Sequence, residues 1–161
     1  MGWDHPTTWR TAPVIIRRAT VEDVPAIVAM LADDELGALR ESPDDLTPYL
    51  RAFEAIDAAG HEVVAVAERD GLVVGTLQLT LLRGLSRRGA TRAQIEGVRV
   101  ASSARGQGLG EALVRWAVEE ATARGCAVVQ LTSDKSRVDA HRFYLRLGFT
   151  RSHEGFKLAL A

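Results

Sequence analysis

The chain has 161 residues, of which 47% are hydrophobic and 25% are charged, and its 20 basic and 21 acidic side chains give a net charge of −1. This length suits one domain with a buried core, and the composition excludes an intrinsically disordered chain. The charge balance argues against a nucleic-acid-binding protein, the single cysteine excludes an intramolecular disulfide and a thiolate metal cluster, and no apolar run has the roughly 20 residues of a membrane span.

The N-terminal third of the chain predicts a leader, a strand and two helices. Residues 1–12 are expected to be a flexible leader, because they are polar and lack the apolar core of a signal peptide. We expect residues 13–161 to form a single cytoplasmic domain. The β-branched residues of 14–19 predict the first strand, after which Thr20 predicts a helix N-cap. A second helix is expected from Pro43, since proline favours the first helical turn.

The middle of the chain predicts a hairpin and a further strand. Two β-rich runs flank Asp70-Gly71, a pair that favours a two-residue hairpin turn. The basic stretch 83–92 then leads into a strand over 93–101. Gly97 lies inside that strand, where a lone glycine indicates a bulge or a close backbone approach.

The last third alternates strands and helices. The longest helix is predicted over 109–124, and the apolar run 126–132 is typical of a buried strand. A short helix is predicted over 139–148, followed by two short strands around Glu154-Gly155. The element order is therefore β α α β β β α β α β β, an α/β fold of the α+β type.

Three glycines separate a predicted strand from the longest helix, in the stretch VRVASSARGQGLGEALVRWA. The phosphate loop of nucleotide hydrolases is excluded because no Gly-Lys pair occurs, and Glu111 and Leu113 stand where a dinucleotide fingerprint needs its third glycine. The pattern that remains is Arg-x-x-Gly-x-Gly, formed by Arg105, Gly108 and Gly110. Small residues let successive N–H groups approach an anion, and the helix adds its positive end. The stretch therefore predicts a pyrophosphate site.

Two segments together resemble a known family. IEGVRVASSARGQGLGEALVRWAVEEA resembles the acyl-coenzyme A binding core of the GNAT acetyltransferase superfamily, and DAHRFYLRLGF resembles its hallmark Ala-x-x-Phe-Tyr-x-x-x-Gly-Phe. The two stand in the family's order and span residues 94–149. The resemblance implies a mixed sheet of about six or seven strands, splayed near the fourth strand and flanked by about four helices. It also implies acetyl transfer from acetyl-coenzyme A to a primary amine by direct attack in a ternary complex.

The resemblance implies which residues bind the cofactor. Backbone N–H groups of the glycine loop would bind the pyrophosphate, Val98 and Val100 would pair with the pantetheine arm, and the N–H near Val98 would stabilise the oxyanion. Arg137 stands where many relatives carry an asparagine that contacts pantetheine, so Ser133, Asp134 or Arg137 is expected to replace it. The expected cofactor contacts are Val98, Val100, Arg105, Gly106, Gln107, Gly108, Leu109, Gly110, Ser133, Arg137 and Phe143.

Two side chains are expected to carry the chemistry. Glu96 occupies a family position often used to take the proton of the amine, and a partly buried carboxylate would have a raised pKa. A structural or substrate-orienting role is the alternative for Glu96. Tyr144 matches the tyrosine that protonates the leaving thiolate, with a core aromatic as the alternative. Cys126 is expected to be structural, and no His, Asp or Glu spacing predicts a metal site.

The acceptor is expected to approach from residues 31–46 and 150–156. The first of these segments is acidic and would attract a cationic amine. The alternative is that its acidic side chains are simply exposed to water at a helix end and have no role in binding. Small-molecule amines and peptide amines both stay open as acceptors. Two other functions stay open as well, a non-catalytic acyl-coenzyme A binding or regulatory module and a toxin-like acetyltransferase acting on aminoacyl-tRNA. No nucleic-acid or membrane partner is expected, and a homodimer stays open.

Overall fold

The computed structural model of the protein describes residues 3, 7–9, 14–33 and 36–160. The chain divides into two compact units, Met1–Gln130 and Leu131–Ala161. The division falls inside the strand β6 (Val128–Leu131). The expectation that residues 13–161 form one domain stays a prediction.

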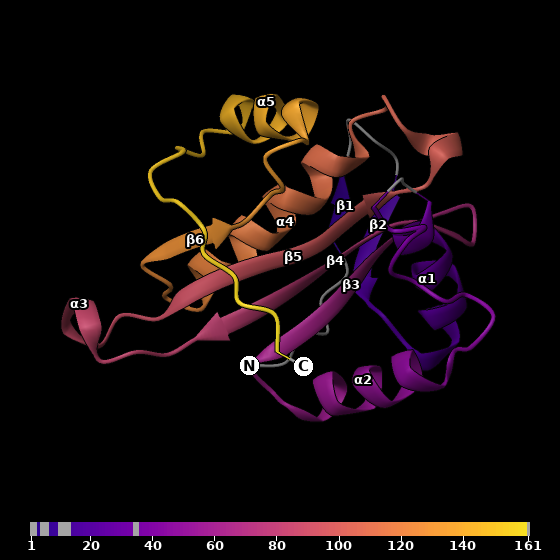
Figure 1. Cartoon of the computed structure of the whole chain (residues 1–161), viewed down its shortest axis with the longest axis horizontal. Coiled ribbons are helices and arrows are strands. Elements are labelled where there is room, and N and C mark those ends of the chain that lie inside the picture. Colours follow the sequence, from indigo (N-terminus) through magenta and orange to yellow (C-terminus); the bar gives the residue numbers. More distant parts are fainter. Residues whose placement is uncertain (1–2, 4–6, 10–13, 34–35, 161) are drawn as a thin grey trace. The chain divides into compact units, whose positions relative to one another are not determined.

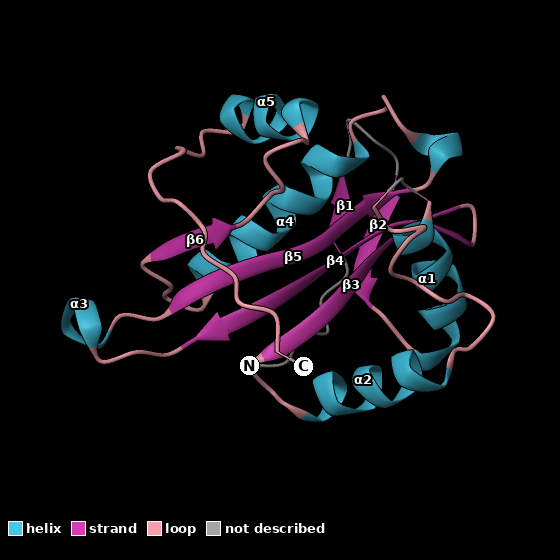
Figure 2. Cartoon of the chain, in the orientation of Figure 1, coloured by secondary structure: helices cyan, strands magenta, loops and turns pink. Residues whose placement is uncertain are grey.

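The strands follow one another in the sheet in the order of the sequence, β1 to β6 (Figure 1, Figure 2). Before β6 they are Thr7–Trp9 (β1), Val14–Arg18 (β2), Glu62–Arg69 (β3), Leu72–Leu82 (β4) and Arg92–Val100 (β5). Four antiparallel ladders with a defined register join β1 to β5. The mixed α/β class is confirmed. The expected count of six or seven strands is not confirmed, because the ladders with a defined register join five strands and none is defined between β5 and β6.

The segment expected as a flexible leader contains structure. Thr7–Trp9 pairs antiparallel with β2, and Trp9 lies opposite Val14. Trp3 is buried, with the guanidinium carbon of Arg124 lying 3.5 Å from its ring centroid. A cation–π contact of this kind fastens Trp3 to the end of the longest helix. The structure therefore differs from the expectation at these residues, while the rest of 1–12 lies outside the described part.

Five α-helical segments occur among the described residues, where about four were expected. They are Val24–Ala32 (α1), Thr47–Ala58 (α2), Ser86–Gly89 (α3), Leu109–Ala123 (α4) and Val138–Arg146 (α5). The unexpected one, α3, is a single turn at the tip of the β4–β5 hairpin. Its Arg87 and Arg88 have positive φ angles of 53° and 61°, so it is not a regular helix.

The first two helices differ from the prediction at their ends. A short 3₁₀ turn, Val21–Asp23, precedes α1, and Thr20 forms the predicted N-cap through a capping box with Asp23. α2 begins at Thr47 with Pro48 in its first turn, so the prediction of a start at Pro43 is wrong. Both prolines satisfy the same local rule, and the sequence pattern alone did not distinguish them.

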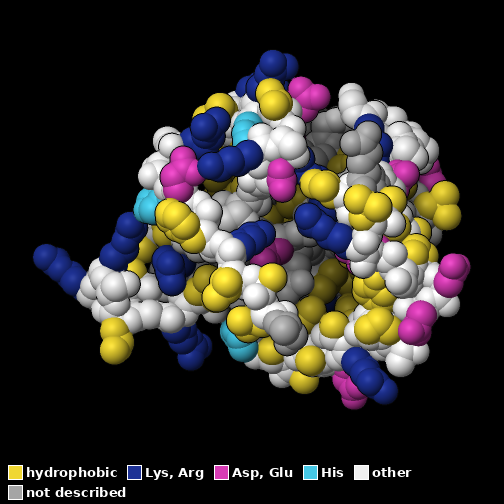
Figure 3. All heavy atoms as spheres, in the orientation of Figure 1, with side chains coloured by type: hydrophobic (Ala, Val, Ile, Leu, Met, Phe, Trp, Pro, Cys, Tyr) yellow, Lys and Arg dark blue, Asp and Glu magenta, His cyan; other side chains and the backbone are white. Residues whose placement is uncertain are grey.

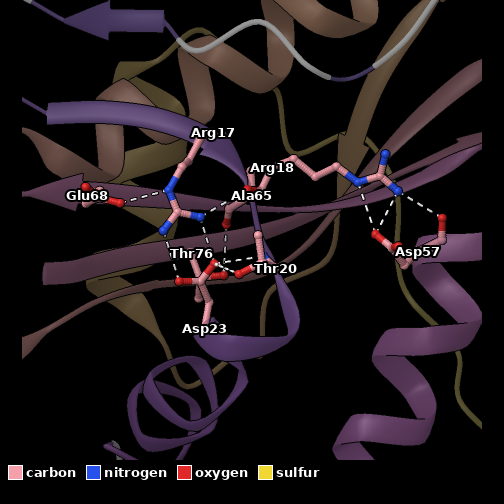
Figure 4. Close-up of polar contacts among 8 residues, drawn as sticks. All are labelled: Arg17, Arg18, Thr20, Asp23, Asp57, Ala65, Glu68 and Thr76. Atoms are coloured by element: carbon pink, nitrogen blue, oxygen red, sulfur yellow. Dashed lines mark hydrogen bonds and ion pairs between the residues drawn. The ribbon is translucent and has the colours of Figure 1, made fainter. Parts of the chain in front are cut away.

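Arg17 ties β2 to the beginning of α1 (Figure 4). Its guanidinium donates hydrogen bonds of 2.7 and 3.0 Å to the two carboxylate oxygens of Asp23, and its Nε donates to Glu68 at 2.8 Å. Burial would raise the pKa of Asp23, but hydrogen bonds from Arg17 and a backbone N–H outweigh burial and hold this pKa below its usual range. Arg18 similarly donates to Asp57 of α2 at 2.7 Å. The two arginines fasten the helical segment to the sheet.

The longest predicted helix is confirmed as α4, and its apolar stripe forms one wall of the core. Leu109, Leu113, Trp116 and Ala117 are 1, 0, 2 and 0% exposed. α4 packs on β4 and β5, where Leu79 and Ile95 are also buried, while α1 and α2 pack on strands β3 to β5. Burial of these apolar side chains is the main force that fixes α4, and with it the loop before α4, against the sheet.

The predictions for the end of the chain hold only in part. The strand predicted in the apolar run 126–132 is present as the four-residue β6, but its residues are half-buried rather than buried. No strand occurs at 149–160, so the two short strands around Glu154-Gly155 are absent from the described residues. Phe156, Leu158 and Leu160 alternate as in a strand but are 94, 87 and 88% exposed. Alternation indicates a strand only where a neighbouring strand supplies the ladder.

Candidate active site

β5 carries a one-residue bulge at Gly97. Its register with β4 places Glu96 opposite Gln78 and Arg99 opposite Thr76, so three steps along β5 match two steps along β4. Gly97 has a φ of 61°, a conformation that favours glycine. The bulge predicted from this lone glycine is therefore confirmed, and Gly97 and Val98 fall between the paired positions of the ladder.

A row of polar side chains runs along β4 and β5 beside the bulge. Glu96 lies opposite Gln78, and Gln94 lies opposite Thr80. Gln130 of β6 extends the row, because its Nε2 donates a 2.8 Å hydrogen bond to Oε1 of Gln94. These five residues, which we call the polar row, place hydrogen-bonding groups on a sheet whose other face is apolar.

Glu96 differs from expectation in its burial. The sequence predicted a partly buried carboxylate, but the side chain is exposed. The carboxylate is therefore accessible to an amine from solvent. Leu31, in the last turn of α1, approaches the bulge, since its Cδ2 lies 3.9 Å from the position that a Cβ would take at Gly97.

The loop before α4 is open on the side of its glycines. Gly106 and Gly108 have φ angles of 74° and 79°, and no atom lies within 4 Å of the position of an added Cβ at either residue. Gly108 is the N-cap of α4, and its carbonyl accepts the hydrogen bond of Ala112 N–H at 3.0 Å. The amides of the first helical turn have no partner inside the helix and point along its positive end. This arrangement fits a pyrophosphate, as the glycine pattern predicts.

Arg105 joins this loop to the end of α1. Its Nη2 donates to the carboxylate of Asp33 at 3.0 Å and to the Asp33 carbonyl at 3.2 Å, while Nε donates to the Val100 carbonyl at 3.2 Å. Arg105 was expected to contact the cofactor through its backbone, and its side chain holds the loop in place. Asp33 belongs to the acidic segment expected at the acceptor entrance, of which Asp34 and Glu35 lie outside the described residues.

Arg69 also contacts the loop, a contact that no motif in the sequence indicates. Its Nη1 donates to Oε1 of Gln107. The Asp70-Gly71 turn, with φ angles of 52° and 76°, ends the β3–β4 hairpin and brings Arg69 there. The hairpin was predicted correctly, but only its register with β5 reveals which end of it meets the loop.

The Leu131–Ala161 unit holds the remaining predicted residues, Ser133, Arg137, Phe143 and Tyr144. Tyr144 packs edge-to-face on Phe143 and Phe149, with ring centroids 5.0 and 5.7 Å apart. Ser133 and Arg137 are half-buried and precede α5. Asp134 between them forms a turn, because its carboxylate accepts hydrogen bonds from the N–H and Oγ of Ser136 at 2.9 and 2.7 Å.

Several features limit the chemistry of the described residues. Cys126 is half-buried, and burial raises the pKa of its thiol, which disfavours a nucleophilic thiolate. No three His, Cys, Asp or Glu side chains in the described ranges gather closely enough to hold a metal ion. Within the same ranges, no helix is long and apolar enough to cross a bilayer.

The chain is similar to known proteins over most of its length. Residues 25–149 match the acetyltransferase (GNAT) family. Over 147 residues, 90% of either chain, the sequence is 33% identical to aminoalkylphosphonate N-acetyltransferase of Salmonella typhimurium. It is 32% identical over 143 residues to glucosamine 6-phosphate N-acetyltransferase of Trypanosoma brucei brucei, covering 77% of this chain and 93% of the other. A transcriptional regulator of known structure from Bacillus halodurans C-125 is 48% identical, with a TM-score of 0.88 over 91% of this chain and 99% of its own.

Proposed function

The chain belongs to the acetyltransferase (GNAT) family, and we propose that it acetylates the primary amine of a small molecule that also carries a phosphonate or phosphate group. As a member of this family it is an acetyl-coenzyme A-dependent N-acetyltransferase. Transfer is direct, in a complex that holds both substrates at once. Acetyl-coenzyme A supplies the acetyl group as a reactive thioester.

Backbone groups of the loop and of β5 hold this donor. We assign its pyrophosphate to the N–H groups of residues 106–110, supported by the open space at Gly106 and Gly108 and by the positive end of α4. We assign its pantetheine arm to the backbone of Val98 and Val100. The position of Val98 outside the β4 ladder supports a role for its N–H in stabilising negative charge on the thioester oxygen.

Glu96 takes a proton from the acceptor. A primary amine is mostly protonated at neutral pH and attacks only in its neutral form, so a base must accept the proton of the ammonium group. Glu96 stands beside the bulge and is exposed, both of which support this assignment. Gln78, which lies opposite Glu96, is uncharged and does not compete as a base.

Tyr144 gives a proton to the departing thiolate. The assignment comes from the match of FYLRLGF to the family's second hallmark. It is supported by the packing of the Tyr144 ring between two aromatic neighbours, which restricts the direction of its phenol group. A phenol with pKa ~10 is able to protonate a short-lived thiolate when the two are close.

The class of acceptor follows from the relatives. One relative acts on aminoalkylphosphonates and another on glucosamine 6-phosphate, and both acceptors join an amine to a phosphorus oxyanion. The acidic segment after α1 supports a purely cationic acceptor less strongly than expected from its charge, because Asp33 is paired with Arg105.

The bulge at Gly97, with Glu96 beside it and the glycine loop at the end of the same strand, carries this proposal. It is tested by measuring thiol release from acetyl-coenzyme A with 2-aminoethylphosphonate, glucosamine 6-phosphate and uncharged primary amines, and by identifying the acetylated product by mass spectrometry. We expect amine-dependent release with a phosphorus-containing amine preferred. Tight acetyl-coenzyme A binding without release for any amine would overturn the proposal.

A further inference from the structure

Arg92 lies on the same face of β5 as Glu96. Residues 92, 94 and 96 alternate with Ala93 and Ile95, which are 0 and 2% exposed on the opposite face, under α4. The register places Arg92 opposite Leu82, two pairs beyond Gln94 and Thr80 and thus on the same face. Arg92 therefore extends the polar row, at the end away from the bulge.

Arg92 also differs from the other arginines of its hairpin. The stretch 83–92 contains four arginines and no acidic residue, and Figure 3 shows Lys and Arg side chains gathered around the projecting end where α3 lies. Arg83, Arg87 and Arg88 are exposed to water, whereas Arg92 is half-buried. In the part of the chain that the structure describes, the guanidinium of Arg92 has no hydrogen-bond or ion-pair partner.

A half-buried guanidinium without an anion is costly. Removal of a cation from water is offset only when hydrogen-bonded negative charge replaces the water. Most arginines of β2, the glycine loop and α4 have such partners, as Arg17 has Asp23 and Arg115 has Glu111. The geometry of Arg92 therefore leaves a place for an anion from outside the chain.

Gln94 presents a second donor to the same place. Its Oε1 accepts the hydrogen bond of Gln130, and its own amide group has no partner among the residues described. An amide has two N–H donors, so Gln94 is able to donate to a ligand while Gln130 fixes its orientation. A guanidinium and an amide N–H side by side suit the oxygens of a phosphonate or phosphate, which guanidinium binds in a bidentate manner.

We infer that Arg92, assisted by Gln94, binds the phosphorus oxyanion of the acceptor while the amine of the acceptor lies at Glu96. This assignment rests on the proposed function. With a rise of about 3.3 Å per residue, the Cα atoms of Arg92 and Glu96 are about 13 Å apart. Their two long side chains are able to lean toward each other along the strand, which brings the guanidinium and the carboxylate closer than the Cα atoms. The span selects acceptors in which the amine and the oxyanion are separated by a few bonds.

The test compares Arg92→Gln with Arg88→Gln, which removes the same charge from the exposed hairpin tip. The probes are 2-aminoethylphosphonate and ethanolamine, which share the amine and differ at the oxyanion. We expect Arg92→Gln to lower kcat/KM for the phosphonate by at least about tenfold and to leave ethanolamine within about twofold, because only the former loses a bidentate contact. Arg88→Gln should behave as the wild type, and Arg92→Lys should recover part of the loss. An equal loss with both amines, or an unchanged preference, overturns the assignment.

A binding measurement separates this inference from the proposed function. Failure of all amines to release thiol would contradict the proposed function but would not decide the role of Arg92. Calorimetric titration of 2-aminoethylphosphonate decides it without turnover. Binding that is at least about tenfold weaker in Arg92→Gln and unchanged in Arg88→Gln supports the inference. Equal affinity in the three proteins, or no binding to the wild type, overturns it.

Discussion

Arg105 of the glycine loop and Asp33 at the end of α1, 72 positions apart in the chain, form an ion pair with Nη2 and Oδ2 3.0 Å apart. The pair connects the loop assigned to the donor with the segment expected at the acceptor entrance. Both side chains are about half exposed, at 52 and 48%, so the pair contributes little to folding stability. Its effect should instead be on ligand affinity.

Replacement of Asp33 by Asn should tighten acetyl-coenzyme A binding. The Asp33 carboxylate lies beside the loop assigned to the pyrophosphate and repels its negative charge, and exposed charge pairs have free energies of about 0.2–1 kcal/mol, which corresponds to a gain of up to about fivefold. Calorimetric titration of Asp33→Asn and of Arg105→Gln measures this. Weaker binding by Asp33→Asn would contradict this repulsion and would indicate that the Asp33–Arg105 pair holds the loop in its binding form.

The glycine loop should be intolerant of a Cβ for reasons of binding rather than stability. Gly108 and Gly60 have similar φ angles, 79° and 66°, and open space around an added Cβ, so alanine should cost each about 1–2 kcal/mol of backbone strain. We expect Gly108→Ala to lose acetyl-coenzyme A affinity by at least about tenfold, and Gly60→Ala to retain it. Comparable affinities in the two variants, at comparable melting temperatures, would exclude the loop as the pyrophosphate site.

Asp23 should stabilise the fold in a pH-dependent manner. Its pKa is lower in the folded protein than in the unfolded chain, so its contribution is complete above about pH 4 and is lost as the pH falls through the folded pKa. Asp23→Asn should therefore lower the free energy of unfolding by about 2 kcal/mol at pH 7, and by less in acid. Urea denaturation at several pH values measures this difference.

Asp57→Asn is the matched control for that measurement. Asp57 also pairs with an arginine, Arg18, but its side chain is 49% exposed, against 9% for Asp23. The exposed pair should contribute less than about 1 kcal/mol. An equal loss of unfolding free energy in the two variants would show that burial of Asp23 does not determine its contribution to stability.

Local features of the fold were predictable from the sequence, and long-range pairings were not. The turn at Asp70-Gly71, the bulge at Gly97 and the N-terminus of α4 each depend on a backbone conformation that a few neighbouring residues encode. The start of α2 was not predictable, because two prolines satisfied the same rule. The strands predicted in the tail also failed, since a strand requires a partner that alternation does not supply.

The residues of the candidate site also divide into those predictable from local motifs and those brought together by long-range contacts. Glu96 and the glycine loop were found from motifs within one stretch of sequence. Arg69, Gln130 and the pairing of Asp33 with Arg105 were missed, because each contact depends on the register of the sheet or the end of a helix and joins residues 36 or more positions apart. Arg92 was noticed only as part of a basic loop. Its place on the face of Glu96 follows from the observed start of β5 and its alternation.

Tyr144→Phe tests the proposed proton donor without disturbing its packing. Phenylalanine retains the edge-to-face contacts with Phe143 and Phe149 and removes only the hydroxyl group. We expect kcat to fall about 100-fold, the lower range for loss of a general acid, with unchanged acetyl-coenzyme A affinity and melting temperature. A variant with wild-type kcat would leave Tyr144 a structural role.

The most direct test of the account is the pH dependence of acetyl transfer by Glu96→Gln, with Glu119→Gln on the exposed face of α4 as control. At pH 7, Glu96→Gln should lower kcat/KM for the amine at least about 100-fold, with acetyl-coenzyme A affinity unchanged. The deficit should shrink as the pH rises, because a larger share of the amine is then neutral without a base. Wild-type rates for Glu96→Gln across this pH range would contradict the assignment of the β5 bulge as the centre of acetyl transfer.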